Sequence, residues 1–529
     1  DGAFAQATQL TEVPAELPNT VTDLQYSFRE TAASSFPNLA FWDVSNVTDM
    51  SYMFSNNTLS VTNYDAVLNS WAAQAVQSNV TFDGGNSQYS PEAAAARQSL
   101  IEDHGWSISD GGQAQLFSGG SGTEGAPYEI AGTDDLVYLS QHDSYWDKHF
   151  IQTADIAFAA DETQVDWDND GSADGAGTSG FSPIGDHFQT GGTSFTGSYD
   201  GQGHTIDNLY IDRPSENFVG VFGVIYGDDD NEFISNLGII NVDSTGQNGV
   251  GGIVGTKMGP VTNPSLTNCY VTGQISGEGM VGALVGECQY STIENCFSDA
   301  TVHGTSHAGG FIGYAFQTTI NNCYSLGDVT RTSGAETRFG AFIGFLSDGS
   351  SNYSYATGSV FESEGVAWGT DASLTDDKGF AGGEHGTITY TANFFDEGAS
   401  NQSSATGATA KTTSEMQDYN TFTDESNSWL SSAWDFVTDP NDDSGTNDYW
   451  DMDQEATVNN GYPILSWQDG ADDDLAPNLV PAFDAGASAA LDVDEDSGAN
   501  AINSLLAVTD NDTGDTLTWS VASAPSHGT

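Results

Sequence analysis

The stretch TIENCFSDATVHGTSHAGGFIGYAFQTTINNCYSLGDV, residues 292–329, contains one motif twice, first as IENCF from Ile293 and again as INNCY from Ile320. The chain has only 4 cysteines, and three of them recur at the interval between these two copies. They are Cys269, Cys296 and Cys323. A regular period of this length indicates a solenoid, in which each repeat forms one coil that stacks on its neighbours. The cysteines therefore recur because the coil recurs.

Further copies of this motif lie on both sides of the opening stretch. They read IDNLYI from 206, ISNLGI from 234, LTNCYV from 266 and, more loosely, SNYSYA from 351. A glycine-rich module precedes or separates them, as VGVFG from 219, VGGIVG from 250, VGALVG from 281, AGGFIG from 308 and FGAFIG from 339. Each unit thus holds two short apolar strands between turn residues, which predicts a mainly β fold with a glycine-rich β-solenoid. Neighbouring coils would lie about 4.8 Å apart, and the glycines would allow tight corners or close approach of coils.

The column that holds the cysteines also holds Leu209, Leu237 and Ser354 in this alignment. A column that accepts leucine and serine predicts small buried side chains, and free cysteine packs well in such places. A disulfide between adjacent coils and a metal site remain as alternatives. Cys288 follows a glycine module and lies in another column.

Residues 112–470, which contain these repeats, resemble the GLUG motif family of bacterial secreted and surface proteins. The resemblance extends to the lead-in FSGGSGTEGAPYEIAGTDDLVYLS, to FTGSYDGQGHTIDNLYI and to the closing NNGYPILSW at 459–467. It implies a large, adhesin-like protein and assigns no catalytic residue.

Residues 19–111 form a different repeat after an N-terminal leader, residues 1–18. VTDLQYSF from Val21 returns as VTDMSYMF from Val47, which again indicates a short solenoid. Helices are predicted for NYDAVLNSWAAQ from Asn63 and for SPEAAAARQSLIEDHG, where Ser90 is the N-cap and Gly105 the stop. We expect them to cap the stack. The segment LAFWDVSNVTDMSYMF and the helices after it resemble the BspA-type leucine-rich repeat of bacterial surface proteins.

Residues 471–529 combine the acidic linker DGADDDLAPN with a stretch that resembles the first half of a bacterial cadherin-like repeat. The resemblance rests on LDVDEDSGAN, TDNDTGDTLTWSV and the terminal PSHGT. It implies a truncated immunoglobulin-like β-sandwich, and we expect the chain to be part of a longer protein.

The charge of the chain excludes several kinds of partner. Against 75 acidic residues stand 9 lysines and arginines, for a formal net charge of −66. Such a chain repels nucleic acid and anionic membranes, whereas it stays soluble in salt and attracts divalent cations. No apolar run is long enough to span a membrane. We therefore expect an extracellular protein, secreted or on a cell surface.

Calcium is the cofactor that the acidic motifs predict. DWDNDGSADGAG, from Asp166 to Gly177, has the oxygen spacing of a calcium loop, although glycine occupies the last ligand position. The candidate ligands there are Asp166, Asp168, Asp170, Ser172 (through its carbonyl) and Asp174. The cadherin-like stretch adds Asp494, Glu495, Asp496, Asp510, Asp512 and Asp515. A plain solvated acidic loop is the alternative.

The favoured function is a calcium-stabilised adhesin-type scaffold that binds glycans or other surface proteins without catalysis. A structural subunit that self-associates into a surface filament or sheath is the alternative, and a β-helix polysaccharide-degrading enzyme is a weaker one. The paired carboxylates of such an enzyme could come from Asp200, Asp207, Glu294 and Asp299. Some aromatic side chains, if exposed, could stack on sugars, although core positions are more common for them. These are Trp42, Tyr52, Tyr145, Trp146, Trp368 and Trp450.

Overall fold

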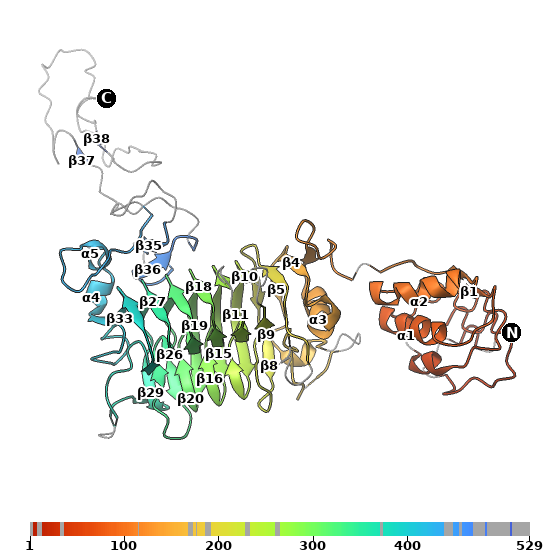
Figure 1. Cartoon of the computed structure of the whole chain (residues 1–529), viewed down its shortest axis with the longest axis horizontal. Coiled ribbons are helices and arrows are strands. Elements are labelled where there is room, and N and C mark those ends of the chain that lie inside the picture. Colours follow the sequence, from red (N-terminus) through yellow and green to blue (C-terminus); the bar gives the residue numbers. More distant parts are fainter. Residues whose placement is uncertain are drawn as a thin grey trace, which may run out of the picture. The chain divides into compact units, whose positions relative to one another are not determined.

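The computed structural model divides into two compact units, Asp1–Gly119 and Gly120–Thr529, and each is described by itself. The described residues are 4–7, 13–31, 36–114, 116–167, 173–175, 177–185, 192–227, 233–259, 265–370, 374–437, 448–453, 458–468, 482–483 and 508–509. Figure 1 labels many of the elements of both units.

The first unit stacks short extended segments in parallel. Strand β1 (Thr81–Asp83) pairs with β2 (Ser107–Ser109), and single bridges join Asp23 to Asp49 and Met50 to Phe82. The ring of Phe28 lies between those of Phe4 and Phe54, with centroid distances of 5.3 and 5.1 Å. Residues of the predicted leader therefore continue this aromatic ladder.

Three helical segments connect the coils of the first unit: the 3-10 helix η1 (Pro37–Phe41), α1 (Val61–Ala72) and α2 (Pro91–Glu102). The Ser90 side chain caps α2 by accepting a hydrogen bond from the amide of Glu92, as its sequence predicts. Helix α1 packs against both η1 and α2. The helices thus form a row, in which each follows an extended segment of its own coil, instead of closing the ends of the stack as expected.

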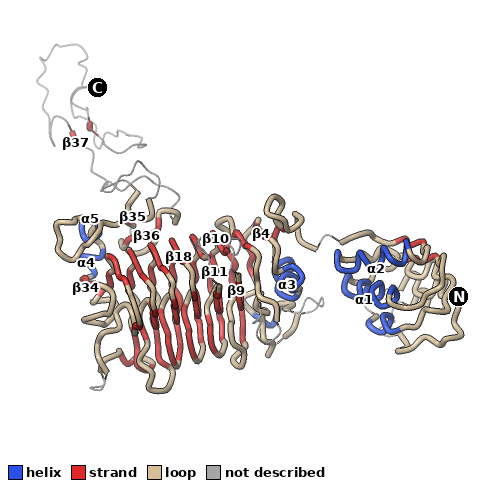
Figure 2. The backbone as a smooth tube through the Cα atoms, viewed as in Figure 1, coloured by secondary structure: helices blue, strands red, loops and turns tan. Residues whose placement is uncertain are grey.

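The second unit is a β-solenoid built from parallel sheets, which confirms the predicted fold class (Figure 2). The nine-stranded sheet contains, in order, β3 (Tyr128–Ile130), β4 (His149–Gln152), β6 (Ser198–Asp200), β10 (Phe233–Ser235), β14 (Leu266–Thr267), β18 (Thr292–Glu294), β22 (Thr319–Asn321), β27 (Ser350–Asn352) and β32 (Thr389–Thr391).

The central path of the thirteen-stranded sheet runs through β34 (Thr409–Lys411), β33 (Phe394–Asp396), β28 (Tyr355–Ala356), β23 (Tyr324–Ser325), β19 (Phe297–Gly304), β15 (Tyr270–Ser276), β11 (Gly238–Thr245), β7 (Thr205–Asp207) and β5 (Ile156–Ala157). The strands β8 (Tyr210–Asp212), β24 (Val329–Arg331), β29 (Val360–Ser363) and β30 (Val366–Ala367) pair beside it.

Two further sheets complete the coils. The six-stranded sheet contains β31 (Glu384–His385), β26 (Ile343–Ser347), β21 (Ile312–Phe316), β17 (Val285–Gln289), β13 (Val254–Met258) and β9 (Phe222–Tyr226). The four-stranded sheet contains β12 (Asn248–Val250), β16 (Gly279–Gly282), β20 (Ser306–Gly309) and β25 (Phe339–Gly340).

Helices lie at both ends of this stack. Helix α3 (Thr133–Gln141) is at the end near β4 and β5, whereas α4 (Thr413–Met416) and α5 (Asn420–Thr423) lie at the other end (Figure 1). Short 3-10 helices, η2 (Asp143–Tyr145) and η3 (Glu162–Gln164), follow α3. Among the described helices, none has both the length and the apolar character needed to cross a membrane.

The asparagine motif marks a corner between two sheets. Asn236, Asn268, Asn295 and Asn322 all have φ between 51° and 54°, a left-handed conformation that asparagine adopts more readily than most residues. The residue after each of these points inward and is fully buried: Leu237, Cys269, Cys296 and Cys323. Ser354 continues this column, and all four cysteines of the chain are free and buried.

Leu209 does not belong to the cysteine column, contrary to the sequence alignment. Ile206 pairs with Ile239, whereas Ile234 pairs with Tyr199 in the other sheet. The motif from 206 is therefore the counterpart of the strand that follows the asparagine corner. The reason is the turn at 201–204, which is longer than the two-residue corner that separates β10 from β11.

Two predictions fall largely outside the described residues. In the first calcium motif this applies to Asp168, Asp170 and Ser172, and in the C-terminal stretch to Asp494, Glu495, Asp496, Asp510, Asp512 and Asp515. Within 471–529 the structure describes the antiparallel pair β37 (Ala482–Phe483) and β38 (Val508–Thr509). The cadherin-like domain stays a prediction.

Candidate functional site along the asparagine corner

The asparagine corner carries a row of side-chain amides. Asn268 donates an Nδ2 hydrogen bond of 2.9 Å to Oδ1 of Asn236, which in turn donates one of 2.9 Å to Oδ1 of Asp200. A carboxamide nitrogen has two N–H groups, so each of these bonds uses one of them. The coils are thereby fixed to one another while polar edges line the corner.

An aromatic ladder runs beside the amides, formed by the first residues of successive strands. The rings of Tyr270, Phe297, Tyr324 and Tyr355 stack at centroid distances of 4.8, 4.9 and 5.0 Å. The ladder ends at Gly238, where a Cβ atom would lie only 2.4 Å from the ring of Tyr270. Tyr270 is half-buried, whereas Tyr324 and Tyr355 are fully buried.

The C-terminal segment of the second unit covers part of this ladder. It contains β35 (Trp450–Met452) and β36 (Pro463–Leu465), which pair antiparallel. The Tyr324 hydroxyl donates to Oε1 of Gln468 (2.9 Å), and the Tyr355 hydroxyl donates to the carbonyl of Pro463 (2.6 Å). The segment buries these phenols, and burial raises their pKa.

Two tryptophans fasten the segment to the corner itself. The indole N–H of Trp450 donates to Oδ1 of Asn322 (3.2 Å), and that of Trp467 donates to the carbonyl of Asn295 (3.2 Å). The Trp467 ring lies 6.0 Å from Tyr270 and 5.9 Å from Phe297 between centroids. The segment thus divides the corner, and a pocket opens on each side of it.

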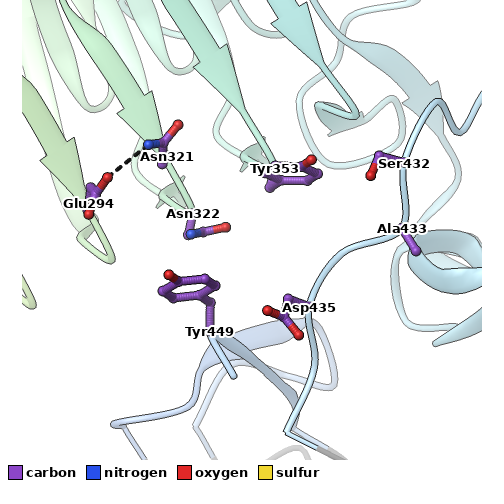
Figure 3. Close-up of a pocket in the computed structure, with 8 residues that line it drawn as sticks. All are labelled: Glu294, Asn321, Asn322, Tyr353, Ser432, Ala433, Asp435 and Tyr449. Carbon is purple, nitrogen blue, oxygen red and sulfur yellow. Dashed lines mark hydrogen bonds between the residues drawn. The ribbon is translucent and has the colours of Figure 1, made fainter. Parts of the chain in front are cut away.

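The first pocket has a volume of about 340 Å³ and is shown in Figure 3. Its lining comes from the coils (Glu294, Asn321, Asn322, Tyr353) and from the C-terminal segment (Ser432, Ala433, Asp435, Tyr449). Asn321 donates an Nδ2 hydrogen bond of 2.9 Å to Oε1 of Glu294. Carboxylates on both walls give this pocket an acidic character.

The second pocket, of about 530 Å³, has an uncharged lining. It consists of Gln202, Gly203, Asn236, Asn268, Tyr270, Trp467 and Gln468. The lining therefore combines side-chain amides from successive coils with the aromatic rings of Tyr270 and Trp467. We call this the amide–aromatic pocket.

The carboxylates considered for an enzyme do not converge. Asp200 and Glu294 lie on the nine-stranded sheet, whereas Asp207 and Asp299 lie on the thirteen-stranded one. Asp200, Asp207 and Glu294 each accept a hydrogen bond of 2.9 Å from an asparagine of an adjacent coil. This arrangement gives the three carboxylates a role in joining coils.

Two of the candidate ligands in the first calcium motif, Asp166 and Asp174, are described. The Asp174 carboxylate accepts a hydrogen bond of 2.7 Å from the backbone amide of Trp167, and the Asp174 amide donates one of 3.0 Å to the carbonyl of Val165. The two ends of the loop are therefore close. Among the described residues, no group of three or more histidine, cysteine or acidic side chains could hold a metal ion.

Sequence reasoning named other aromatic residues than those that line the pockets. Of the six proposed, five are buried in the structure, and Tyr52 alone is exposed. Tyr270 and Trp467 were not named. Tyr270 carried a signal, because it follows the asparagine motif; Trp467 lies in the closing stretch, whose sequence does not indicate the coil that it contacts.

Comparisons with known proteins agree with the repeat architecture. Residues 2–89 match the family described as "Mycoplasma protein of unknown function, DUF285", and residues 304–330 match the GLUG motif. A solved structure titled a "putative immunoglobulin A1 protease from Bacteroides ovatus" shares 22% identity and covers 66% of this chain and 96% of its own, with a TM-score of 0.39. At that TM-score the likeness supports no inference about this chain.

Two relatives are similar to about a third of the chain or less. Halomucin of Haloquadratum walsbyi is 37% identical over 148 residues, which cover 28% of this chain and 2% of that protein. A "Putative Gly-rich membrane protein" of Evansella cellulosilytica is 30% identical over 162 residues, 29% of this chain and 16% of that protein. The chain therefore spans a small part of either relative. The family matches and these relatives together fit a surface repeat protein with a GLUG-type β-solenoid.

Proposed function

We propose that the chain is a non-enzymatic, adhesin-type scaffold of an extracellular surface protein. The observation that carries this proposal is the uninterrupted stack of parallel coils whose corner is only partly covered by the C-terminal segment. Stacked coils hold their corner residues at fixed spacing, which suits an extended binding surface. The family matches and the relatives support a surface location.

The net charge of −66 supports the same role. A strongly acidic surface keeps a protein soluble and monomeric in salt, and it disfavours anionic partners. The second unit therefore suits ligands that are neutral or cationic, presented by a cell surface, by a polysaccharide or by another surface protein.

Calcium is proposed as a stabiliser through the loop that begins at Asp166. The hydrogen bond between Asp174 and the amide of Trp167 supports this assignment, because it holds two described residues of the motif close together. A cation that binds only the folded state at 100 times its Kd would stabilise it by about 2.7 kcal/mol. Thermal unfolding in calcium and in chelator measures this difference.

The matched variants for calcium are Asp174→Asn and Asp147→Asn. Asparagine keeps an oxygen for the Trp167 amide and removes the charge, so Asp174→Asn should abolish the calcium-dependent shift in Tm. Asp147, whose side chain is 60% exposed beside Lys148, serves as the control and should leave the shift intact. Equal Tm values for the unmodified chain in calcium and chelator would end the calcium proposal.

Binding to cell envelopes tests the scaffold role. The full chain, fluorescently labelled, should bind envelope preparations saturably and release no reducing or unsaturated sugar ends from polysaccharides. Negative-stain electron microscopy of the same sample should show single particles with calcium and with chelator. Regular filaments in calcium, or an absence of saturable binding to any envelope, would contradict the adhesin-type role.

A further inference from the structure

We propose that the amide–aromatic pocket binds a neutral glycan, with the sugar ring packed against Trp467 and its hydroxyl groups bonded to the amides of Asn236 and Asn268. This inference rests on the proposed surface-binding role and names the ligand class and the site. It concerns one pocket on the corner of the second unit.

The lining combines the two kinds of group that a sugar needs. A pyranose ring has an apolar face of C–H groups and an equator of hydroxyls that both donate and accept hydrogen bonds. Trp467 and Tyr270 offer amphipathic rings, each half-buried, so part of each ring is accessible. The carboxamides of Asn236, Asn268 and Gln202 offer donors and acceptors.

The hydrogen bonds within the corner leave capacity for a ligand. Asn268 uses one N–H for Asn236, and Asn236 uses one for Asp200, so each nitrogen retains a second N–H. The Trp467 N–H is directed to the carbonyl of Asn295, which fixes the indole ring against the coils. The pocket is therefore preorganised, with the ring held and the amides placed by the coil spacing.

Charge selects the class of glycan. The lining residues are all uncharged, in a chain with 75 acidic and 9 basic residues. The surrounding negative field disfavours uronic acids and sulfated sugars. A phosphate ligand would lack a basic side chain in this lining, and an apolar ligand would leave the amides without hydrogen bonds. A neutral sugar carries no charge for the negative field to repel, and its hydroxyl groups can form hydrogen bonds with the amides.

The size and position of the pocket fit one segment of a polymer. Its volume of about 530 Å³ lies within the range of about 300 to 1,000 Å³ that is usual for small-molecule sites. The acidic pocket of Figure 3 shares no lining residue with the amide–aromatic pocket and forms no part of the proposed site.

The experiment uses the full chain and defined probes. Affinity electrophoresis and calorimetry measure binding to neutral glucan, mannan, galactan and chitin oligosaccharides, with alginate as the anionic comparison. Two variants alter the pocket, Trp467→Ala and Asn268→Asp. We expect the unmodified chain to bind at least one neutral glycan, and each variant to weaken that binding roughly tenfold or more, the effect usual for the central aromatic residue of a binding site.

Matched controls separate the site from general damage. Trp429, which is 41% exposed outside the pocket, is replaced in Trp429→Ala. Asn352 donates to Asn321 of the preceding coil at 2.9 Å, the same bond that Asn268 makes, and is replaced in Asn352→Asp. Both controls should bind like the unmodified chain. Cys269, adjacent to Asn268 and fully buried, should stay unreactive toward a thiol reagent in every variant, which verifies the coil.

The outcomes test the glycan site separately from the proposed scaffold role. Loss of glycan binding in the two pocket variants alone supports the site. Undiminished binding in folded Trp467→Ala and Asn268→Asp overturns it, as does an unmodified chain that binds alginate but no neutral glycan. Envelope binding that persists without any glycan binding overturns the glycan site and leaves the scaffold role standing, with a protein as the partner.

Discussion

Replacing Gly282 by alanine would drive a methyl group into the backbone of its own coil at Val285 and into that of the neighbouring coil at Ile312 and Gly313. A Cβ atom at this position would lie 2.2 Å from the carbonyl oxygen of Val285, 2.6 Å from the amide nitrogen of Gly313 and 2.7 Å from the Cα of Ile312. All three contacts are shorter than 3.0 Å, which real Cβ atoms essentially never show, and all are to backbone atoms. The turn of the coil at 282–285 must therefore change shape and the two coils must move apart.

The energetic cost follows from this geometry. Overpacking a close-packed interior costs about 1 to 3 kcal/mol, and rigid backbone atoms favour the upper end. Alanine recovers about 0.4 to 1 kcal/mol by restricting the unfolded chain. We therefore expect Gly282→Ala to lower local stability by about 2 kcal/mol, which corresponds to a roughly 30-fold larger open population because 1.4 kcal/mol is tenfold.

Amide hydrogen exchange of β16, β17, β20 and β21 measures this opening. The Leu284 amide donates to the carbonyl of Phe311 at 3.0 Å, and its exchange should accelerate by that factor. Gly125→Ala is the control, since a Cβ there meets nothing within 4 Å. If Gly282→Ala exchanged like the control, the close approach of coils would not explain the glycine module.

Four further predictions concern other parts of the chain. Trp450→Ala should destabilise the closing segment by about 3 to 5 kcal/mol, because the ring is fully buried, and limited proteolysis should cut that segment first. Phe28→Ala should cost the first unit a similar amount, measured by denaturant unfolding of the chain. Burial raises the pKa of Cys288 to about 11, so the native thiol should stay unreactive at pH 8 and react after denaturation. A hydrogen bond from the Thr412 amide lowers the pKa of Glu415, so its stabilisation of α4 is complete above the ordinary pKa of 4.5 and is lost as pH falls through the lower folded value; Glu415→Gln should remove this acid dependence in exchange measurements.

The β-solenoid could be predicted from the sequence because each coil contacts its nearest copies. Residues that recur at equivalent positions of successive coils therefore identify the interior, as the buried cysteines do. The asparagine recurs because its position has a positive φ. The helix Pro91–Glu102 could be predicted because its N-cap residue, Ser90, precedes it directly in the sequence. The alignment was wrong at Leu209. A longer turn places the motif from 206 on the strand after the corner, although its sequence resembles the copies that lie before the corner.

The position of the closing segment on the asparagine corner could not be predicted in this way. Tyr324 contacts Gln468, 144 residues away, and Trp467 contacts Asn295, 172 residues away. A nonrepeating segment has no column to place it, and its aromatic residues would suit many coils equally. The sequence by itself determined the repeated coil, since its contacts are between equivalent positions. Only the tertiary structure decided where the closing segment lies and which amides and rings remain open, because that choice depends on packing between parts distant in the chain.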